Sequence, residues 1–177
     1  MASEDEEFTT LFQDFYPSLC RFLECLLGGR AALAQDLAQE SFLQLHRSAW
    51  TKLPPGEARF WLYRVARNFA INEFRKGQTR YRLFEQVVQV MRPRGRNPEE
   101  EYEAQERQRI VLEMLQGLPE DQRTALLLRE QEQLSYREIG QVLNISESKV
   151  KIDIFRARTT LRELWARRTQ AYSAGGH

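Results

Sequence analysis

The chain has 177 residues, of which 42% are hydrophobic and 29% charged, with only nine Gly and six Pro, so we expect a soluble, helix-rich protein of one domain or two small ones. No apolar run is long enough to span a membrane, and the acidic start at residues 4 to 7 is the opposite of a signal peptide, so we expect a cytoplasmic protein without direct membrane insertion. The net charge of +1 conceals two basic segments, residues 59 to 82 and 147 to 168, separated by acidic ones. This segregation excludes a uniformly basic coat and suggests two contact points on a polyanion.

Three amphipathic helices are predicted in the first half of the chain, over residues 8 to 27, 31 to 48 and 57 to 76. The Gly28-Gly29 pair ends the first helix, and Pro54-Pro55-Gly56 makes residues 49 to 56 a loop. Cys20 and Cys25 lie five residues apart in the first helix. Because the chain has only these two Cys and two His, buried free thiols are favoured over a disulfide or a metal site.

Helical patterns also dominate the second half of the chain. The periodicity is weaker over residues 77 to 98, where we predict a short helix at residues 83 to 91 and a flexible linker at 92 to 98. Further helices are predicted over residues 99 to 115 and from Leu118-Pro119 onward, because Pro fits the first turn of a helix. The end of the chain, residues 170 to 177, is predicted to be disordered. Since no strand pattern appears, the predicted fold class is all-α.

Residues 135 to 158 predict two helices joined by a tight turn. Ser135 and Glu138 have the spacing of a capping box, and Gly140 allows close packing of the second helix. Asn144 tolerates the positive φ that the turn requires, and Ser146 is placed to cap the second helix.

The second of these helices has one apolar and one basic side. Val150, Ile154 and Ala157 recur at helical spacing and are expected to face inward. The outer faces are expected to carry Lys149, Lys151, Arg156 and Arg158. This is the pattern of a helix-turn-helix, whose second helix enters a DNA major groove. An ordinary pair of helices with a solvated basic face is the alternative.

Two other clusters admit two interpretations each. Asp36, Gln39 and Glu40 share one helical face, which is either solvated or binds a partner; no nucleophile lies nearby in sequence to complete a catalytic site. The helix from Phe60 to Lys76 interleaves basic residues with aromatic ones, which suits single-stranded nucleic acid. The alternative interpretation is that its aromatic residues lie partly in the core and its arginines are only solvated.

Several motifs, taken in this order and spacing, resemble one family. They are Asp36-Leu-Ala-Gln-Glu-Ser-Phe, Trp61-Leu-Tyr-Arg-Val-Ala-Arg-Asn, Leu118-Pro-x-x-x-Arg, Leu134-Ser-Tyr-Arg-Glu-Ile and Arg156-Ala-Arg. Over about residues 8 to 165 the chain is similar to the bacterial RNA polymerase sigma factors of the extracytoplasmic-function (ECF) group. The resemblance implies an acidic tail at residues 1–7, region 2 at 8–80, a linker at 81–103, region 4 at 104–168 and a C-terminal tail at 169–177.

The resemblance also implies a binding role for each part. The helix at 31 to 48 would dock on the clamp coiled coil of the polymerase β′ subunit, through Asp36, Gln39, Glu40 and Phe42. The helix at 57 to 76 and the preceding loop would read and open the minus-10 promoter element, capturing an unpaired base in the loop. The residues for this step would be Trp50, Lys52, Arg59, Trp61, Arg64, Arg67, Asn68, Asn72, Arg75 and Lys76.

The helix-turn-helix would read the minus-35 element as duplex DNA and touch the flap of the polymerase β subunit. The residues for this step would be Tyr136, Ser146, Ser148, Lys149, Lys151, Ile152, Phe155, Arg156 and Arg158. The resemblance implies no catalytic residue, no metal and no cofactor, and it implies an anti-sigma factor as a further partner.

This sequence departs from the family pattern at several positions, among them the recognition helix, where the family commonly has Gly-Thr-Val-Lys-Ser-Arg and this chain has Ser148-Lys-Val-Lys-Ile-Asp153. Ile152 replaces a hydroxyl donor and is expected to contact a thymine methyl group. Asp153 replaces a cation, which either removes a phosphate contact or allows a hydrogen bond from a cytosine amino group. Asn72 stands where the family often has Asp, which makes that helix less acidic.

The sequence therefore predicts a sigma factor, not an enzyme, that binds core polymerase and promotes promoter opening. A sigma-like decoy, which would occupy an anti-sigma factor without binding DNA, is favoured by Asp153 alone and opposed by the basic helix at 59 to 76. A conventional helix-turn-helix regulator that binds duplex DNA as a dimer leaves the first 76 residues without a purpose.

Overall fold

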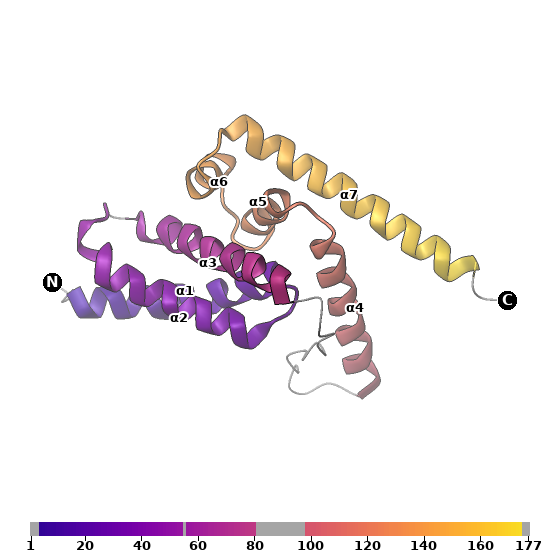
Figure 1. Cartoon of the computed structure of the whole chain (residues 1–177), viewed down its shortest axis with the longest axis horizontal. Helices are drawn as coiled ribbons and strands as arrows, with labels where there is room; N and C mark the ends of the chain where they lie inside the picture. The colour runs from indigo at the N-terminus through magenta and orange to yellow at the C-terminus, as the bar shows by residue number, and fades with distance from the viewer. Residues whose placement is uncertain (1–3, 55, 81–97, 175–177) are drawn as a thin grey trace. The chain divides into compact units, whose positions relative to one another are not determined.

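The computed structural model describes residues 4–54, 56–80 and 98–174, and these ranges contain helices and turns but no strand (Figure 1). The all-α prediction is thus confirmed for the described residues. The chain divides into two compact units, residues 1–91 and 92–177, which we call the N-terminal and C-terminal domains. The helix predicted at 83 to 91 and the linker residues 81 to 97 lie outside the described ranges.

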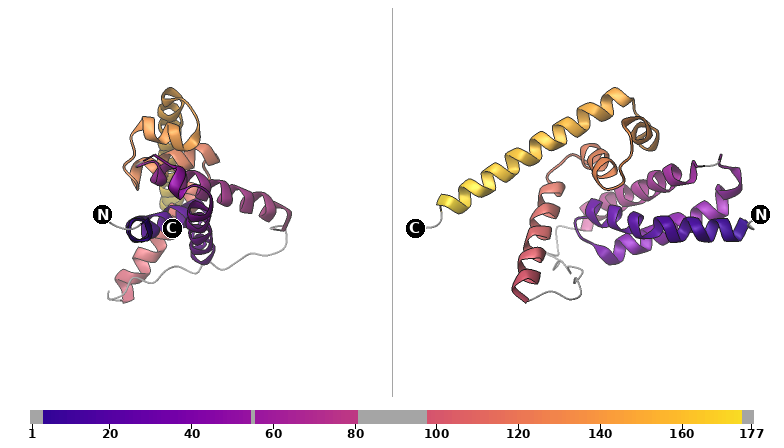
Figure 2. Two further views of the ribbon diagram at one scale, coloured as in Figure 1. Left: turned by 90° about the vertical axis from the view of Figure 1, so that its left-hand side faces the viewer. Right: turned by 180° about the vertical axis from the view of Figure 1, so that it is seen from behind.

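Three helices form the N-terminal domain, namely α1 (Glu4–Leu26), α2 (Ala31–Ser48) and α3 (Ala58–Arg80). Each packs against the other two, as Figure 2 shows from two sides. Their facing sides bury an apolar core at helical spacing, in which each large side chain contributes about 1.5–3 kcal/mol by leaving water. The core includes Leu19, Phe22, Leu23, Leu26, Ala34, Ala38, Leu45, Leu62, Ala66 and Ala70.

The turns of this domain follow from their glycines and prolines. Gly28 and Gly29 have φ values of 70° and 91°, which other residues rarely adopt, and the Gly29 N–H donates to the Glu24 carbonyl at 2.8 Å. The predicted end of the first helix is therefore confirmed. The segment predicted as a loop between α2 and α3 also contains one turn of 3-10 helix, η1 (Trp50–Lys52).

The C-terminal domain consists of α4 (Pro98–Gln116), α5 (Glu120–Glu130), α6 (Tyr136–Leu143) and α7 (Glu147–Ala174). α7 packs against each of the other three. Its extent differs from the prediction, since the helix continues to Ala174 through most of the segment predicted as a tail. α4 likewise begins at Pro98, inside the predicted linker. The core of the domain includes Leu118, Ala125, Leu128, Leu134, Ile139, Val142, Val150, Ile154 and Ala157.

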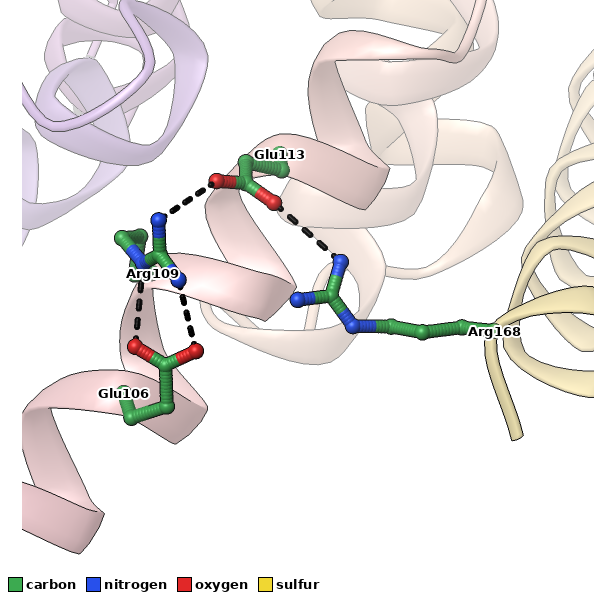
Figure 3. A network of polar contacts seen from close by, with 4 residues as sticks. All are labelled: Glu106, Arg109, Glu113 and Arg168. Carbon is green, nitrogen blue, oxygen red and sulfur yellow. Dashed lines mark hydrogen bonds and ion pairs between the residues drawn. The ribbon is translucent and has the colours of Figure 1, made fainter. Parts of the chain in front are cut away.

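An ion-pair network fastens the distal half of α7 to α4 (Figure 3). Glu113 lies 3.5 Å from Arg109 of the same helix and 3.3 Å from Arg168 of α7. Arg109 also binds both carboxylate oxygens of Glu106, at 2.6 and 3.0 Å, and this contact lowers the pKa of Glu106. Exposed pairs of this kind are individually weak. The close approach of Leu164 to Gly117, where a Cβ atom would lie 3.2 Å from Leu164 Cδ1, adds packing at the same junction.

The turn between α4 and α5 is held by a buried arginine. Arg123 is 7% exposed, and its guanidinium donates to the Gln116 side chain at 2.6 Å and to the Leu118 carbonyl at 3.0 Å. Burial lowers the pKa of Arg123, which nonetheless stays charged because the pKa of arginine is so high. The Leu118 to Arg123 motif is thus structural, as its sequence suggests.

Candidate nucleic-acid interface

The turn between α6 and α7 has the geometry that its sequence predicts. The Ser135 hydroxyl accepts from the Glu138 N–H at 3.2 Å, and the Glu138 carboxylate accepts from the Ser135 N–H at 2.7 Å, which completes the capping box. Asn144 has φ 55° and ψ 47°, in the left-handed region. The Lys149 N–H donates to the Ser146 hydroxyl at 3.2 Å, which caps the start of α7.

Gly140 is required for this turn. A Cβ atom at this position would lie 2.8 Å from the carbonyl oxygen of Ile145, and the Ile145 N–H donates to the Gly140 carbonyl at 3.0 Å. The chain between α6 and α7 can therefore close tightly only over a residue without a side chain.

α7 presents the predicted outer face in its first three turns. Val150, Ile154 and Ala157 are buried, which confirms the inward side. Most of the residues predicted to read the minus-35 element are exposed, and Tyr136, on α6, is half-buried. The exposed set comprises Ser146, Ser148, Lys149, Lys151, Ile152, Phe155, Arg156 and Arg158.

Asp153 does not lie on that outer face. It is 4% exposed and pairs with Lys149 at 2.5 Å, one helical turn away. The predicted hydrogen bond from a cytosine amino group to Asp153 is therefore wrong, because the carboxylate is buried against the rest of the domain. Its place was readable from spacing, since position 153 follows Val150 by three residues and belongs to the buried stripe with Ile154 and Ala157.

Further contacts join the cations of α7 to neighbouring groups. Lys151 lies 3.2 Å from Glu147, and Arg158 lies 2.6 Å from Glu130 of α5. The hydrogen bond to Glu130 raises the pKa of Arg158. The Tyr136 ring has the Lys151 ammonium 5.7 Å from its centroid. These contacts tie Lys151 and Arg158 to acids of the same domain on the outer side of α7.

α3 carries a polar stripe along its exposed side. The exposed members recur at intervals of three or four residues and are Arg64, Asn68, Asn72, Arg75 and Lys76. The other predicted minus-10 residues of this helix, Arg59, Trp61 and Arg67, are half-buried. Arg59 is held at the start of α3 with its guanidinium carbon 5.5 Å from the centroid of the Phe15 ring.

The aromatic residues of α3 divide between surface and core. Tyr63 is 1% exposed and packs edge-on against Phe22, with ring centroids 5.2 Å apart. It belongs to the core, so Trp61 is the aromatic residue of the Trp61-Leu-Tyr motif that remains partly accessible for stacking on a base.

Trp50 and Lys52 lie in the turn η1, before α3. Lys52 is exposed, whereas Trp50 is half-buried with its ring 5.3 Å from that of Phe8. This contact anchors the start of the segment in which a base-binding pocket is predicted. Pro55, within the same segment, lies outside the described residues.

α2 presents a third candidate surface. Asp36, Gln39 and Glu40 are exposed, and the Gln39 amide donates to the Tyr16 hydroxyl at 3.4 Å. Phe42, predicted beside them, is 2% exposed and packs on Phe12 with ring centroids 4.9 Å apart, so it supports this helix from the core.

Leu43 was missed by the sequence analysis. It is 47% exposed and follows Asp36 by seven residues, which places it on the same face. An apolar residue at this spacing on a polar face was the signal available in the sequence. We call Asp36, Gln39, Glu40 and Leu43 the α2 face.

Neither a metal site nor a membrane span is found within the described ranges. No group of three or more His, Cys, Asp or Glu residues there is arranged to hold a metal ion, and no helix there has the length and apolarity to cross a bilayer. Cys20 and Cys25 are free thiols but half-buried, not buried as predicted, and burial raises the pKa of Cys20.

Comparisons with known proteins agree with the architecture of both domains. The family model of sigma-70 region 2 matches residues 11–80, and that of sigma-70 region 4 matches residues 108–161. The ECF RNA polymerase sigma factor SigM of Bacillus subtilis is 29% identical over 162 residues, which cover 89% of this chain and 94% of the relative. The ECF RNA polymerase sigma-E factor of Haemophilus influenzae is 37% identical over 133 residues, which cover 70% of this chain and 69% of the relative.

A solved structure has the same fold. The sigma factor RpoE in complex with the anti-sigma factor NepR, from Bartonella quintana, matches with a TM-score of 0.71 and 21% identity, over 90% of this chain and 97% of that one. With both sigma regions matched in order and relatives similar over most of their length, the chain belongs to the sigma-70 family, as an RNA polymerase sigma factor of the ECF group.

Proposed function

We propose that this sigma factor directs core RNA polymerase to a restricted set of promoters by dividing the work among three surfaces. The α2 face binds the polymerase, the polar stripe of α3 engages the minus-10 element, and the outer face of α7 reads the minus-35 element. The observation that carries the proposal is that each domain exposes one helix face rich in basic residues. Two such faces match two separate contacts on one polyanion. The protein would act in the cytoplasm, where the polymerase is.

The α2 face is proposed to dock on the clamp of the β′ subunit. Two carboxylates with an exposed leucine between polar neighbours suit a partner surface that is basic around an apolar contact. Glu40→Lys reverses one charge at this face and should abolish stable binding to core polymerase. Asp14→Lys makes the same change at another exposed acid of the domain and should leave binding intact. Equal loss in both variants would reject the α2 face as the contact.

The polar stripe of α3 is proposed to bind the minus-10 element as its strands separate. Guanidinium groups hold the phosphates, the asparagines offer hydrogen bonds to exposed base edges, and Trp61 stacks on an unpaired base. Pulling a base out of the duplex costs a few kcal/mol, which these contacts and a pocket in the segment before α3 must offset.

Run-off transcription tests the function directly. Core polymerase is incubated with a cognate promoter template, with and without this chain. Initiation at one promoter position only in its presence supports the proposal. Stable core binding without initiation at any template would contradict it. With Asp153 buried, the feature that favoured a decoy no longer does so.

An anti-sigma factor is proposed as the regulator of this chain. The support is that the similar RpoE structure is a complex with an anti-sigma factor. Such a partner would act by covering the α2 face or the two DNA-binding faces. Co-purification of the chain from its host, followed by identification of the bound protein, tests this proposal. Recovery of polymerase subunits alone would count against it.

A further inference from the structure

Two large apolar side chains stand exposed on the outer face of α7. Ile152 is 49% exposed and Phe155 is 68% exposed. They are three residues apart in one helix, so their side chains are neighbours on its surface. A single exposed apolar residue is ordinary in a soluble protein. An adjacent pair on the face proposed to enter a major groove is a feature that binding should explain.

The cations beside this pair are mostly engaged with acids of the same domain. Lys149 pairs with Asp153, Lys151 with Glu147 at 3.2 Å, and Arg158 with Glu130 at 2.6 Å. From residue 147 to 158, Arg156 is the one basic side chain without an ion pair. Phosphate binding by the other three must compete with these contacts, so the outer face is less strongly cationic than its sequence suggests.

Thymine methyl groups supply the matching chemistry. On the major-groove edges of the four bases, the C5 methyl of thymine is the apolar group, and aliphatic or aromatic side chains are suited to contact it. We infer that α7 reads its duplex through contacts of Ile152 and Phe155 with thymine methyl groups, while the basic side chains around them position the helix on the phosphates. The inference rests on the proposed function of α7 as the minus-35 reader.

An apolar pair of this kind also suits a protein partner. The surroundings favour DNA, because Lys149, Lys151, Arg156 and Arg158 surround the pair on the exposed side of the helix. Such a ring of cations fits phosphates on both sides of a groove. Replacement of thymine by uracil separates a DNA contact from a protein contact.

The test replaces thymine by uracil, which lacks only the methyl group. Core polymerase carrying the full chain is first used to select duplexes from a pool randomised over the minus-35 region. Deoxyuridine is then substituted for each thymidine of a selected duplex in turn, and affinity is measured by competition. We expect about fourfold weaker binding at one or two positions, as for the loss of one buried methyl group.

Variants assign these positions to the side chains. Ile152→Ala should weaken duplex binding and remove the effect of uracil at one position. Ile152→Val keeps a branched apolar side chain and should retain the uracil effect. Phe155→Ala should act in the same way at a neighbouring position. Arg156→Ala is the matched control, because it should weaken thymine and uracil duplexes by the same factor.

Each outcome decides the question. Loss of the uracil effect in the alanine variants supports the inference. Selected duplexes that bind equally well with uracil at every position would overturn it while leaving the proposed function intact. Ile152→Ala or Phe155→Ala weakening polymerase binding with an unchanged uracil effect would also overturn it and assign the pair to a protein contact. Failure to select any duplex would overturn the proposed function and this inference together.

Discussion

The carboxylate of Asp153 neutralises Lys149 at the start of α7, the helix proposed to read duplex DNA. Because the acid is buried and Lys149 is half-exposed, Asn at this position should keep the packing while releasing the ammonium. Because the new amide stays buried and loses its charged partner, we expect Asp153→Asn to destabilise the C-terminal domain by about 1–3 kcal/mol. The salt dependence of duplex binding should steepen by about 0.9 in log–log slope if Lys149 then reaches one phosphate.

A second variant serves as the comparison for Asp153. Glu147→Gln releases Lys151 from a pair in which both side chains are exposed, a contact that water already weakens. Its effect on the slope should be smaller than that of Asp153→Asn. A slope unchanged by Asp153→Asn would show that Lys149 does not approach the DNA backbone.

Glu24 gives the N-terminal domain a predictable response to pH. Burial raises the pKa of its carboxyl group, so the folded state holds that proton more tightly than the unfolded state. The stability due to the protonated form is present at low pH and is lost as the pH rises through the raised pKa. Glu24→Gln should therefore raise the unfolding midpoint at pH 7, with a gain that vanishes near pH 4.

Urea unfolding, followed by tryptophan fluorescence in a Trp165→Phe background, isolates this domain. Trp50 and Trp61 then report the N-terminal domain alone. Asp14→Asn, at an exposed acid of the same helix, should show no such pH-dependent gain. Equal gains at pH 4 and pH 7 for Glu24→Gln would contradict the assigned cause.

At the scale of elements, the turn between α6 and α7 depends on Gly140. Alanine would add up to about 1 kcal/mol of helix propensity to α6, but its Cβ would lie 2.8 Å from a backbone oxygen. We expect the clash to prevail and Gly140→Ala to destabilise the C-terminal domain by roughly 1–3 kcal/mol. Arg137→Ala, on the exposed side of α6, should stay within about 0.5 kcal/mol. Chemical denaturation monitored by circular dichroism measures both, and a stabilised Gly140→Ala would refute the close approach.

The elements could be predicted from sequence because their signals are local. The capping box at Ser135, the left-handed Asn144 and the Gly28-Gly29 end of α1 each depend on a few consecutive residues. The burial of Phe42 depends instead on which side of its helix the neighbours cover, and motif resemblance had placed it on a binding surface. The resemblance placed Asp153 at a DNA contact as well, although its spacing from Val150 indicated the buried side. The family could thus be identified from motifs, whereas the roles of single residues required the packing.

At the scale of the whole molecule, the two faces proposed to bind DNA belong to separate compact domains. Arg64→Ala and Arg156→Ala should each weaken promoter binding by the polymerase complex and lower the salt slope by about 1. Because the two arginines belong to separate compact domains, the double variant should lose the sum of the two free energies within about 0.5 kcal/mol. Its salt slope should fall by about 2.

Competition binding at several salt concentrations measures these effects. If the double variant binds promoter DNA with the same affinity as the single variant of lower affinity, only one face contacts DNA at a time. A slope unaffected by either change would remove both arginines from the phosphate contacts.

α7 is one continuous helix of 28 residues, about 42 Å long at 1.5 Å per residue. Its first turns carry Ile152 and Phe155, and near its other end Leu164 and Arg168 meet α4. In a continuous helix of this length, a small tilt at one end displaces the side chains near the other end. Arg168 and Ile152 are 16 residues apart, or about 24 Å along the axis, so a tilt of about 5° at Arg168 moves Ile152 by roughly 2 Å, more than half of the 3.4 Å rise of one base pair. We therefore expect the junction of α4 and α7 to influence the register in which the outer face of α7 meets a duplex.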